Sequence, residues 1–114
     1  MDKYLELTGA LKGIPRQGWV QRDVPVPESV AGHMYQMAMM CITYPWDNES
    51  DRARAVEMAL VYDAPEAIAG DVTPSDGVSK DDKRQREELA LDFLACLLRK
   101  DGYYKFADRV KGLW

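Results

Sequence analysis

A single histidine and three acidic residues stand out in this sequence as side chains that could do chemistry together. His33 lies in an apolar segment, and Asp63, Glu66 and Asp71 follow it further along the chain. Imidazole and carboxylate groups are ligands that divalent metals accept, and residues three apart, such as Asp63 and Glu66, can share one helix face. These residue types therefore allow a metal centre. They also allow a packed or surface histidine and a helix-capping role for the two acidic residues.

The segments that carry these residues have the periodicity of helices. Apolar side chains recur at helical spacing between residues 28 and 43, which predicts a helix that Pro45 ends. A second helix, capped by a polar residue at position 48 or 50, is expected to stop near Tyr62. Asp63 can then start a short helix that Gly70 closes. The candidate chemistry is thus expected on neighbouring helices.

The remaining segments also predict helices and no strands. Residues 2–12 suit a short helix, whereas 14–27 and 71–77 hold prolines and polar residues and are predicted to be loops. Ser79 can cap a long helix, and 103–114 predicts a weaker amphipathic one. The apolar stripe of the long helix is expected at Leu89, Ala90, Phe93, Leu94, Leu97 and Leu98. The prediction is a compact all-α bundle of about five to six helices.

The composition limits the class of protein. A length of 114 residues predicts one domain, 1–114, and 46% apolar with 30% charged residues predicts a chain that folds. The net charge of −4 argues against nonspecific binding to nucleic acid or to anionic membranes. The N-terminus lacks the pattern of a signal peptide, so we expect an intracellular, cytoplasmic protein. Cys41 and Cys96 fall in apolar helical patterns and are expected to be core residues.

Three segments, taken together, carry a more specific signal. They are PRQGWV at 15–20, PESVAGHMY at 27–35 and ALVYDAPEAIAGDVTP at 59–74, followed by SKDDK at 79–83. In order and spacing they resemble the HD-domain 5′-deoxynucleotidases, which dephosphorylate deoxynucleoside 5′-monophosphates. The resemblance covers most of the chain and implies an HD-like helical fold.

The resemblance implies roles for the acidic residues and the histidine. His33 and Asp63 match two ligands of a divalent metal ion, which would be Co, Mn, Mg, Zn or Fe. Glu66 and Asp71 match the acidic residues at the attacking water. A bound divalent cation lowers the pKa of its water and stabilises charge on the phosphoryl oxygens, so the resemblance implies metal-dependent hydrolysis near neutral pH.

The resemblance also implies a substrate and a partner. Arg16 and Trp19 match loop residues near the phosphate and the sugar of the substrate, although an aromatic residue beside Val20 can equally be a core residue. The substrate would be a deoxynucleoside monophosphate or a similar small phosphate ester. A homodimer is implied as well, and an early C-terminus that leaves apolar surface uncovered supports it.

The chain departs from the family pattern at several positions. Tyr62 stands where the family has the histidine of its His-Asp pair, and Gly32 stands where an acidic residue is usual. A phenol is a poor metal ligand at neutral pH, so Tyr62 is a weak candidate. The matching segment ends at about Trp114, whereas related chains continue and supply a last aspartate ligand. Asp108 is a weak candidate for that ligand, since it can equally form a solvated ion pair.

Three hypotheses follow. The first is a metal-dependent phosphohydrolase of the 5′-deoxynucleotidase type, with activity that the Tyr62 substitution impairs. The second is a catalytically inactive relative that binds a nucleotide or a protein. The third is a shortened product without an independent role.

Overall fold

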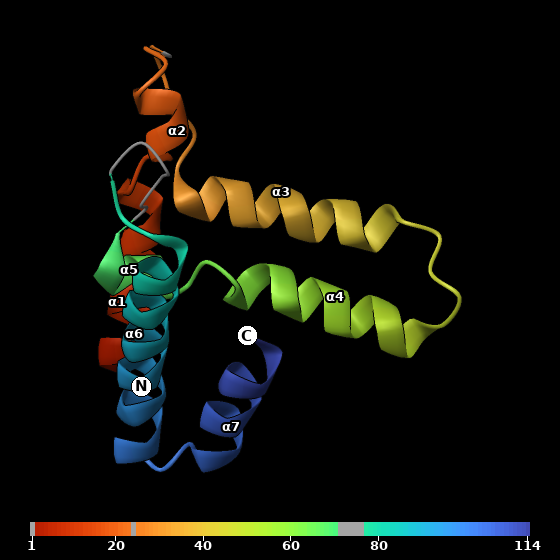
Figure 1. The fold of residues 1–114 in the computed structure, drawn as a ribbon. Coiled ribbons are helices and arrows are strands. Elements are labelled where there is room, and N and C mark those ends of the chain that lie inside the picture. The colour runs from red at the N-terminus through yellow and green to blue at the C-terminus, as the bar shows by residue number, and fades with distance from the viewer. Residues whose placement is uncertain (1, 24, 71–76) are drawn as a thin grey trace.

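The computed structural model describes residues 2–23, 25–70 and 77–114, and in these ranges every regular element is a helix (Figure 1). The elements are α1 (Asp2–Gly9), the 3-10 helix η1 (Ala10–Gly13), α2 (Gln17–Val20), α3 (Val30–Thr43), α4 (Glu49–Val61), α5 (Glu66–Ala69), α6 (Lys80–Lys100) and α7 (Tyr104–Leu113). Five of these described helices have eight residues or more. The prediction of an all-α protein is confirmed.

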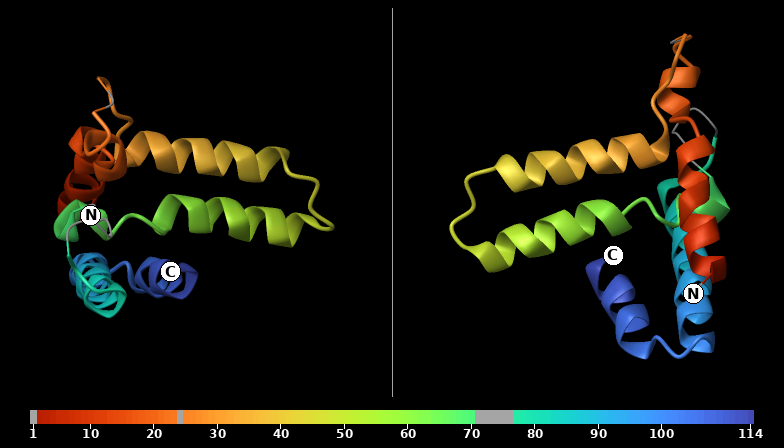
Figure 2. Two further views of the ribbon diagram at one scale, coloured as in Figure 1. Left: turned by 45° about the horizontal axis from the view of Figure 1, so that its top comes forward. Right: turned by 180° about the vertical axis from the view of Figure 1, so that it is seen from behind.

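Helices α3 and α4 form an antiparallel hairpin that projects from the rest of the molecule (Figures 1 and 2). Ser29 caps α3, because its hydroxyl oxygen accepts a 2.9 Å hydrogen bond from the backbone N–H of Gly32. Tyr44 ends the helix in an extended conformation, as expected of a residue before proline. Asn48 caps α4 by accepting from Asp51 N. Both predicted helices are therefore confirmed, and the cap at position 48 is the one that forms.

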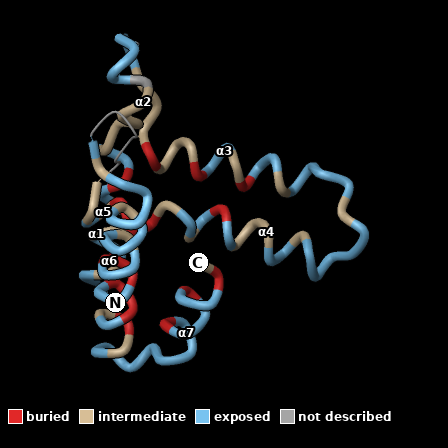
Figure 3. The backbone as a smooth tube through the Cα atoms, viewed as in Figure 1, coloured by how far each residue is buried: buried red, intermediate tan, exposed pale blue. Residues whose placement is uncertain are grey.

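The main core lies between α6 and α7 (Figure 3). Its buried residues are Leu91, Ala95, Leu98, Ala107 and Val110, with Tyr4, Val61 and Trp114 packed against them. A smaller cluster of Leu11, Val30 and Met34 joins η1 to the start of α3. This second cluster matters for the site, because it fixes the first turn of α3, where His33 lies, against the N-terminal segment.

Helix α6 buries only part of the predicted stripe, namely Ala90, Leu94 and Leu98. Leu89 and Phe93 are 70% and 50% exposed, and Cys96 is exposed as well. The buried positions are Ala90, Leu91, Leu94, Ala95 and Leu98. Apolar residues surround much of this helix, so periodicity alone could not select the buried face. The prediction of a core position is wrong for Cys96, and Cys41 is only partly buried.

Short helices correct two further predictions. Residues 17–20 were predicted to lie in a loop but form α2. Helix α5 begins after Pro65 rather than at Asp63, and Pro65 provides no side-chain cap. Gly70 ends α5 as predicted, with a φ of +79° that a residue with a side chain rarely adopts. Among the described helices none is long and apolar enough to cross a membrane.

Candidate functional site

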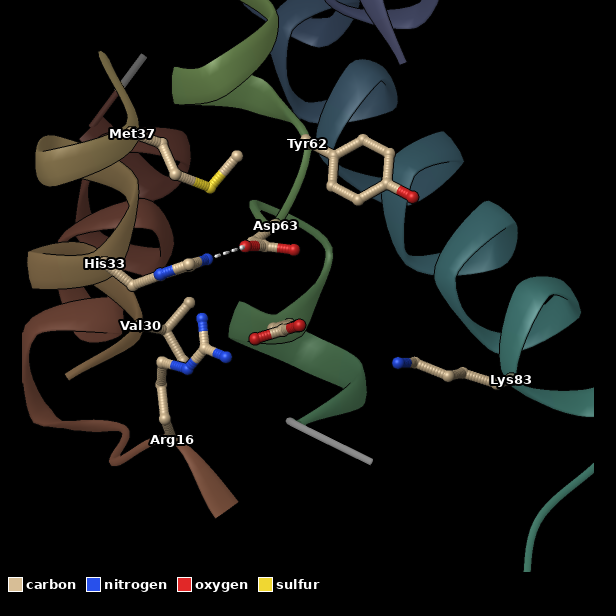
Figure 4. A pocket seen from close by; sticks show the side chains of 8 residues that line it. Arg16, Val30, His33, Met37, Tyr62, Asp63 and Lys83 are labelled. Carbon is tan, nitrogen blue, oxygen red and sulfur yellow. Dashed lines mark ion pairs between the residues drawn. The ribbon is translucent and has the colours of Figure 1, made fainter. Parts of the chain in front are cut away.

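A pocket of about 210 Å³ lies where α3, α5 and the start of α6 meet (Figure 4). Its lining combines two basic and two acidic side chains with one imidazole, one phenol and two apolar groups. The residues are Arg16, Val30, His33, Met37, Tyr62, Asp63, Glu66 and Lys83. The structure therefore brings together five of the residues singled out from the sequence, together with Lys83, which was not assigned a role.

The antiparallel hairpin of α3 and α4 places His33 opposite Asp63. His33 lies in the first turns of α3, and Asp63 follows the last turn of α4. The two side chains point toward one another, with His33 Nε2 3.8 Å from Asp63 Oδ2 (Figure 4). Both side chains are more than two-thirds shielded from solvent. The two side chains therefore converge on one pocket.

Arg16 enters the pocket from the segment before α2. Its backbone N–H donates a 2.9 Å hydrogen bond to the carbonyl of Glu28, and Val30 N donates to Ile14 O at 2.8 Å. Pro15 and Ser29 form an isolated antiparallel bridge between these hydrogen bonds. This pairing holds Arg16 beside the N-terminus of α3, so its guanidinium lies next to His33.

Glu66 is the buried acidic residue of the pocket. It lies in the first turn of α5 and is 7% exposed. Its backbone N–H donates to Asp63 O at 3.0 Å, so a tight backbone turn connects Glu66 to Asp63. A carboxylate so deeply placed beside a polar pocket is a candidate for accepting a proton from a bound water.

Lys83 approaches the pocket from the opposite side to Arg16 (Figure 4). It lies in the first turn of α6, where its backbone N–H donates to Ser79 O at 3.0 Å, and its ammonium is 3.9 Å from Glu87 Oε1. No sequence pattern indicates this role, because lysine is common near exposed helix termini. The packing of α6 against α5 brings it to the pocket.

The remaining predicted residues do not all reach the pocket. Trp19 lies in α2, but its side chain is outside the described part of the structure, as is Asp71. Asp108 is on α7, does not line this pocket, and accepts a 3.1 Å hydrogen bond from Arg99 Nη2. This is the solvated ion pair that was the alternative interpretation of Asp108, formed with a different arginine from its sequence neighbour.

Tyr62 lines the pocket without facing the imidazole and carboxylate. Its side chain is 53% exposed, and its hydroxyl points away from His33 and Asp63 (Figure 4). Its backbone is held in place because the indole N–H of Trp114 donates to Tyr62 O at 3.1 Å. The phenol is therefore not placed as a ligand beside the other two groups.

The described residues fit part of a divalent metal site. The 3.8 Å between His33 Nε2 and Asp63 Oδ2 is below the sum of two metal–ligand bonds of about 2.0–2.2 Å, so both atoms can contact one ion. Within the described ranges, no group of three or more His, Cys, Asp or Glu side chains is arranged to hold a metal. His33 and Asp63 can contribute two ligands, and a third protein ligand is not provided there.

Comparisons with known proteins bear on the family of this chain. A family model described as HD domain matches residues 8–114. Human 5′-deoxynucleotidase HDDC2 is 44% identical over 99 residues, which cover 87% of this chain and 48% of that protein. The zebrafish (Danio rerio) protein of the same name is 42% identical over 114 residues, covering 100% of this chain and 54% of its own. The fission yeast (Schizosaccharomyces pombe) 5′-deoxynucleotidase hdd1 is 36% identical over 88 residues, which cover 77% of this chain and 44% of that protein. The chain spans about half the length of these curated relatives.

Proposed function

Because this chain belongs to the HD-domain family, we propose that its pocket binds a deoxynucleoside 5′-monophosphate and supports weak, metal-dependent hydrolysis of the phosphate ester. The observation that carries this proposal is the convergence of Arg16, His33, Asp63, Glu66 and Lys83 on one pocket. The substrate class comes from the names of the curated relatives, which are 5′-deoxynucleotidases.

The two basic residues account for binding of the phosphate. A phosphate monoester carries a charge of about −1.5 to −2 at neutral pH. Arg16 and Lys83 point into the pocket from opposite sides and can contact different phosphate oxygens (Figure 4). The planar guanidinium of Arg16 can donate two parallel hydrogen bonds, whereas Lys83 supplies a point charge. Trp19, in α2, is the proposed contact for the sugar.

The acidic residues and the imidazole account for hydrolysis. His33 and Asp63 would hold a divalent ion, which when bound lowers the pKa of a water and stabilises charge on the phosphoryl oxygens. Glu66 would orient the attacking water and accept its proton, with Asp71 as the second acidic group. The two ligands found among the described residues make a weak site, since ligand number sets metal affinity. The turnover rate should therefore be low.

A second candidate function is nucleotide or protein binding without turnover. The position of Tyr62 favours it, because a phenol that points away from His33 and Asp63 replaces an imidazole that the family pattern places there. This function retains the phosphate contacts of Arg16 and Lys83 and requires no metal.

Phosphate release from deoxynucleoside monophosphates, measured with added Co²⁺ or Mn²⁺, separates the two functions. Hydrolysis predicts slow release that is lost in Asp63→Ala, since this variant removes one of the two metal ligands. Binding without turnover predicts no release in either protein and a nucleotide affinity that survives without metal. The absence of both release and binding would reject both functions.

We also propose that the chain forms a homodimer. Leu89 and Phe93 are largely exposed on one face of α6, and contiguous exposed apolar surface is commonly covered by a partner. Light scattering coupled to gel filtration should give twice the chain mass, and Phe93→Ser should shift it toward the monomer. A monomeric wild-type protein at micromolar concentration would reject the dimer.

A further inference from the structure

We propose that Glu28, which lies behind the pocket residues Arg16 and His33, is a positioning residue that orients both side chains toward the bound phosphate ester. This inference rests on the proposed binding of a nucleoside monophosphate. One oxygen of Glu28, Oε1, lies 3.4 Å from Arg16 Nε and 3.6 Å from His33 Nδ1. Glu28 is not among the residues that line the pocket, so it acts through its two neighbours.

The backbone fixes Glu28 and Arg16 in register. Arg16 N donates to Glu28 O, and the bridge between Pro15 and Ser29 follows directly. Ser29 then caps α3, and His33 N donates to Ser29 O at 3.0 Å. Arg16, Glu28 and His33 are therefore held by one continuous set of backbone hydrogen bonds, although the α2 segment separates Arg16 from the other two in the sequence.

This arrangement turns the Arg16 guanidinium so that it can donate hydrogen bonds into the pocket. With Nε turned toward Glu28, the two terminal nitrogens of the guanidinium point into the pocket (Figure 4). Those nitrogens carry four N–H donors, enough for two bonds to a phosphate. A guanidinium already held by a carboxylate also loses less conformational freedom when the ligand binds.

Glu28 has a corresponding effect on the imidazole. A carboxylate that accepts the Nδ1–H of a histidine fixes the tautomer with a lone pair on Nε2. In this protein Nδ1 faces Glu28 and Nε2 faces Asp63 on the pocket side. Glu28 therefore presents Nε2 as the acceptor or ligand atom of His33.

The opposite interpretation is that Glu28 contributes only its charge. A carboxylate near the site repels a phosphate, so on charge alone its removal should strengthen nucleotide binding. A positioning role predicts the reverse, because removal of Glu28 frees Arg16 to leave the pocket. The sign of the change in affinity therefore separates the two interpretations.

The test measures dAMP binding to the full chain by calorimetry for wild type, Glu28→Ala and Glu28→Gln. We expect Glu28→Ala to weaken binding by about tenfold. Glu28→Gln should retain most of the affinity, because its amide oxygen can still accept from Arg16. Glu57→Ala is the matched control, since it also removes a negative charge and an arginine partner, Arg109, but lies outside this pocket.

A double variant shows whether the effect passes through Arg16. Once Arg16→Ala is present, Glu28→Ala should cause little further loss. Unchanged or stronger dAMP binding by Glu28→Ala, or an equal loss in both backgrounds, would overturn the inference. If wild type binds dAMP and Arg16→Ala weakens it while Glu28→Ala does not, the proposed function stands and the positioning role fails. If wild type does not bind dAMP, both fail.

A spectroscopic measurement tests the imidazole separately. His33 is the single histidine of the chain, so its ring nitrogens are unambiguous in a long-range ¹H–¹⁵N spectrum of untagged protein. At about pH 8.5, where an imidazole is ordinarily neutral, wild type should show protonated Nδ1. Glu28→Ala should shift the equilibrium toward protonated Nε2. The same tautomer in both proteins would contradict the role assigned to Glu28 at His33.

Discussion

Replacing either basic residue of the pocket should weaken binding of a deoxynucleoside monophosphate, and Arg16 should matter more than Lys83. The side chain of Arg16 is 31% exposed, and Glu28 holds it in place. A hydrogen bond to a charged group contributes about 1.5–3 kcal/mol in a shielded site, so Arg16→Ala should weaken dAMP binding by about 10- to 150-fold. Lys83 is 40% exposed, and Glu87 competes for its ammonium. Lys83→Ala should therefore cost about 1 kcal/mol, close to fivefold.

Calorimetric titration with dAMP measures both losses directly. Lys80→Ala is the matched control, because Lys80 is an exposed lysine in the same first turn of α6 that does not line the pocket. The loss for Lys83→Ala should shrink in high salt more than the loss for Arg16→Ala, since the lysine is more exposed to screening. Equal losses for Lys80→Ala and Lys83→Ala, or no loss for Arg16→Ala, would refute the assignment of these residues to the phosphate.

Three further predictions concern the metal, the core and an ion pair. Tyr62→His should raise Co²⁺ affinity by at least about tenfold in calorimetry, since position 62 lines the pocket and an imidazole there can turn toward His33 and Asp63, from which the phenol points away; no gain would mean that the backbone does not allow this turn. Leu94→Ala should lower the free energy of unfolding by about 2–5 kcal/mol in urea titrations, because Leu94 is fully buried, and a loss below about 1 kcal/mol would contradict that packing. Arg109 lowers the pKa of Glu57, mainly through its hydrogen bonds. The ion pair therefore stabilises the fold at pH values above the ordinary carboxyl pKa, and this contribution is lost as the pH falls through the lowered pKa. Glu57→Gln should therefore reduce the urea midpoint slightly at pH 7, and this gap should narrow as the pH falls below the ordinary carboxyl pKa. An equal gap at pH 7 and pH 3 would contradict the shift.

Helix boundaries were predictable where a single residue determines them. Pro45 and Gly70 act through local backbone chemistry, and each has the predicted effect. Helix α2 was missed because four residues that include a glycine and a β-branched valine show no helical periodicity. The buried face of α6 was partly misassigned because Leu89 and Phe93 are as apolar as the residues that pack. The packing of α7, α5 and α1 against α6 decides between the faces.

The sequence predicted those site residues that match the functional residues of one family. His33, Asp63 and Glu66 line one pocket, as the segments around them implied. Glu28 and Lys83 were not assigned roles, because their positions depend on contacts between segments distant in sequence. Glu28 reaches Arg16 through the Pro15–Ser29 bridge, and Lys83 reaches the pocket through the packing of α5 on α6. No local pattern encodes either contact.

Titration of ¹⁵N-labelled protein with dAMP, followed by amide NMR, tests the central claim most directly. If the phosphate ester binds between α3, α5 and α6, the largest saturable shifts should fall at Arg16, His33, Asp63, Glu66 and Lys83. A second, mainly apolar pocket lies between α4 and α7 and is lined by residues that include Leu60, Phe106 and Leu113. Shifts confined to that pocket, or no saturable shifts at millimolar dAMP, would contradict a nucleotide site at Arg16 and His33.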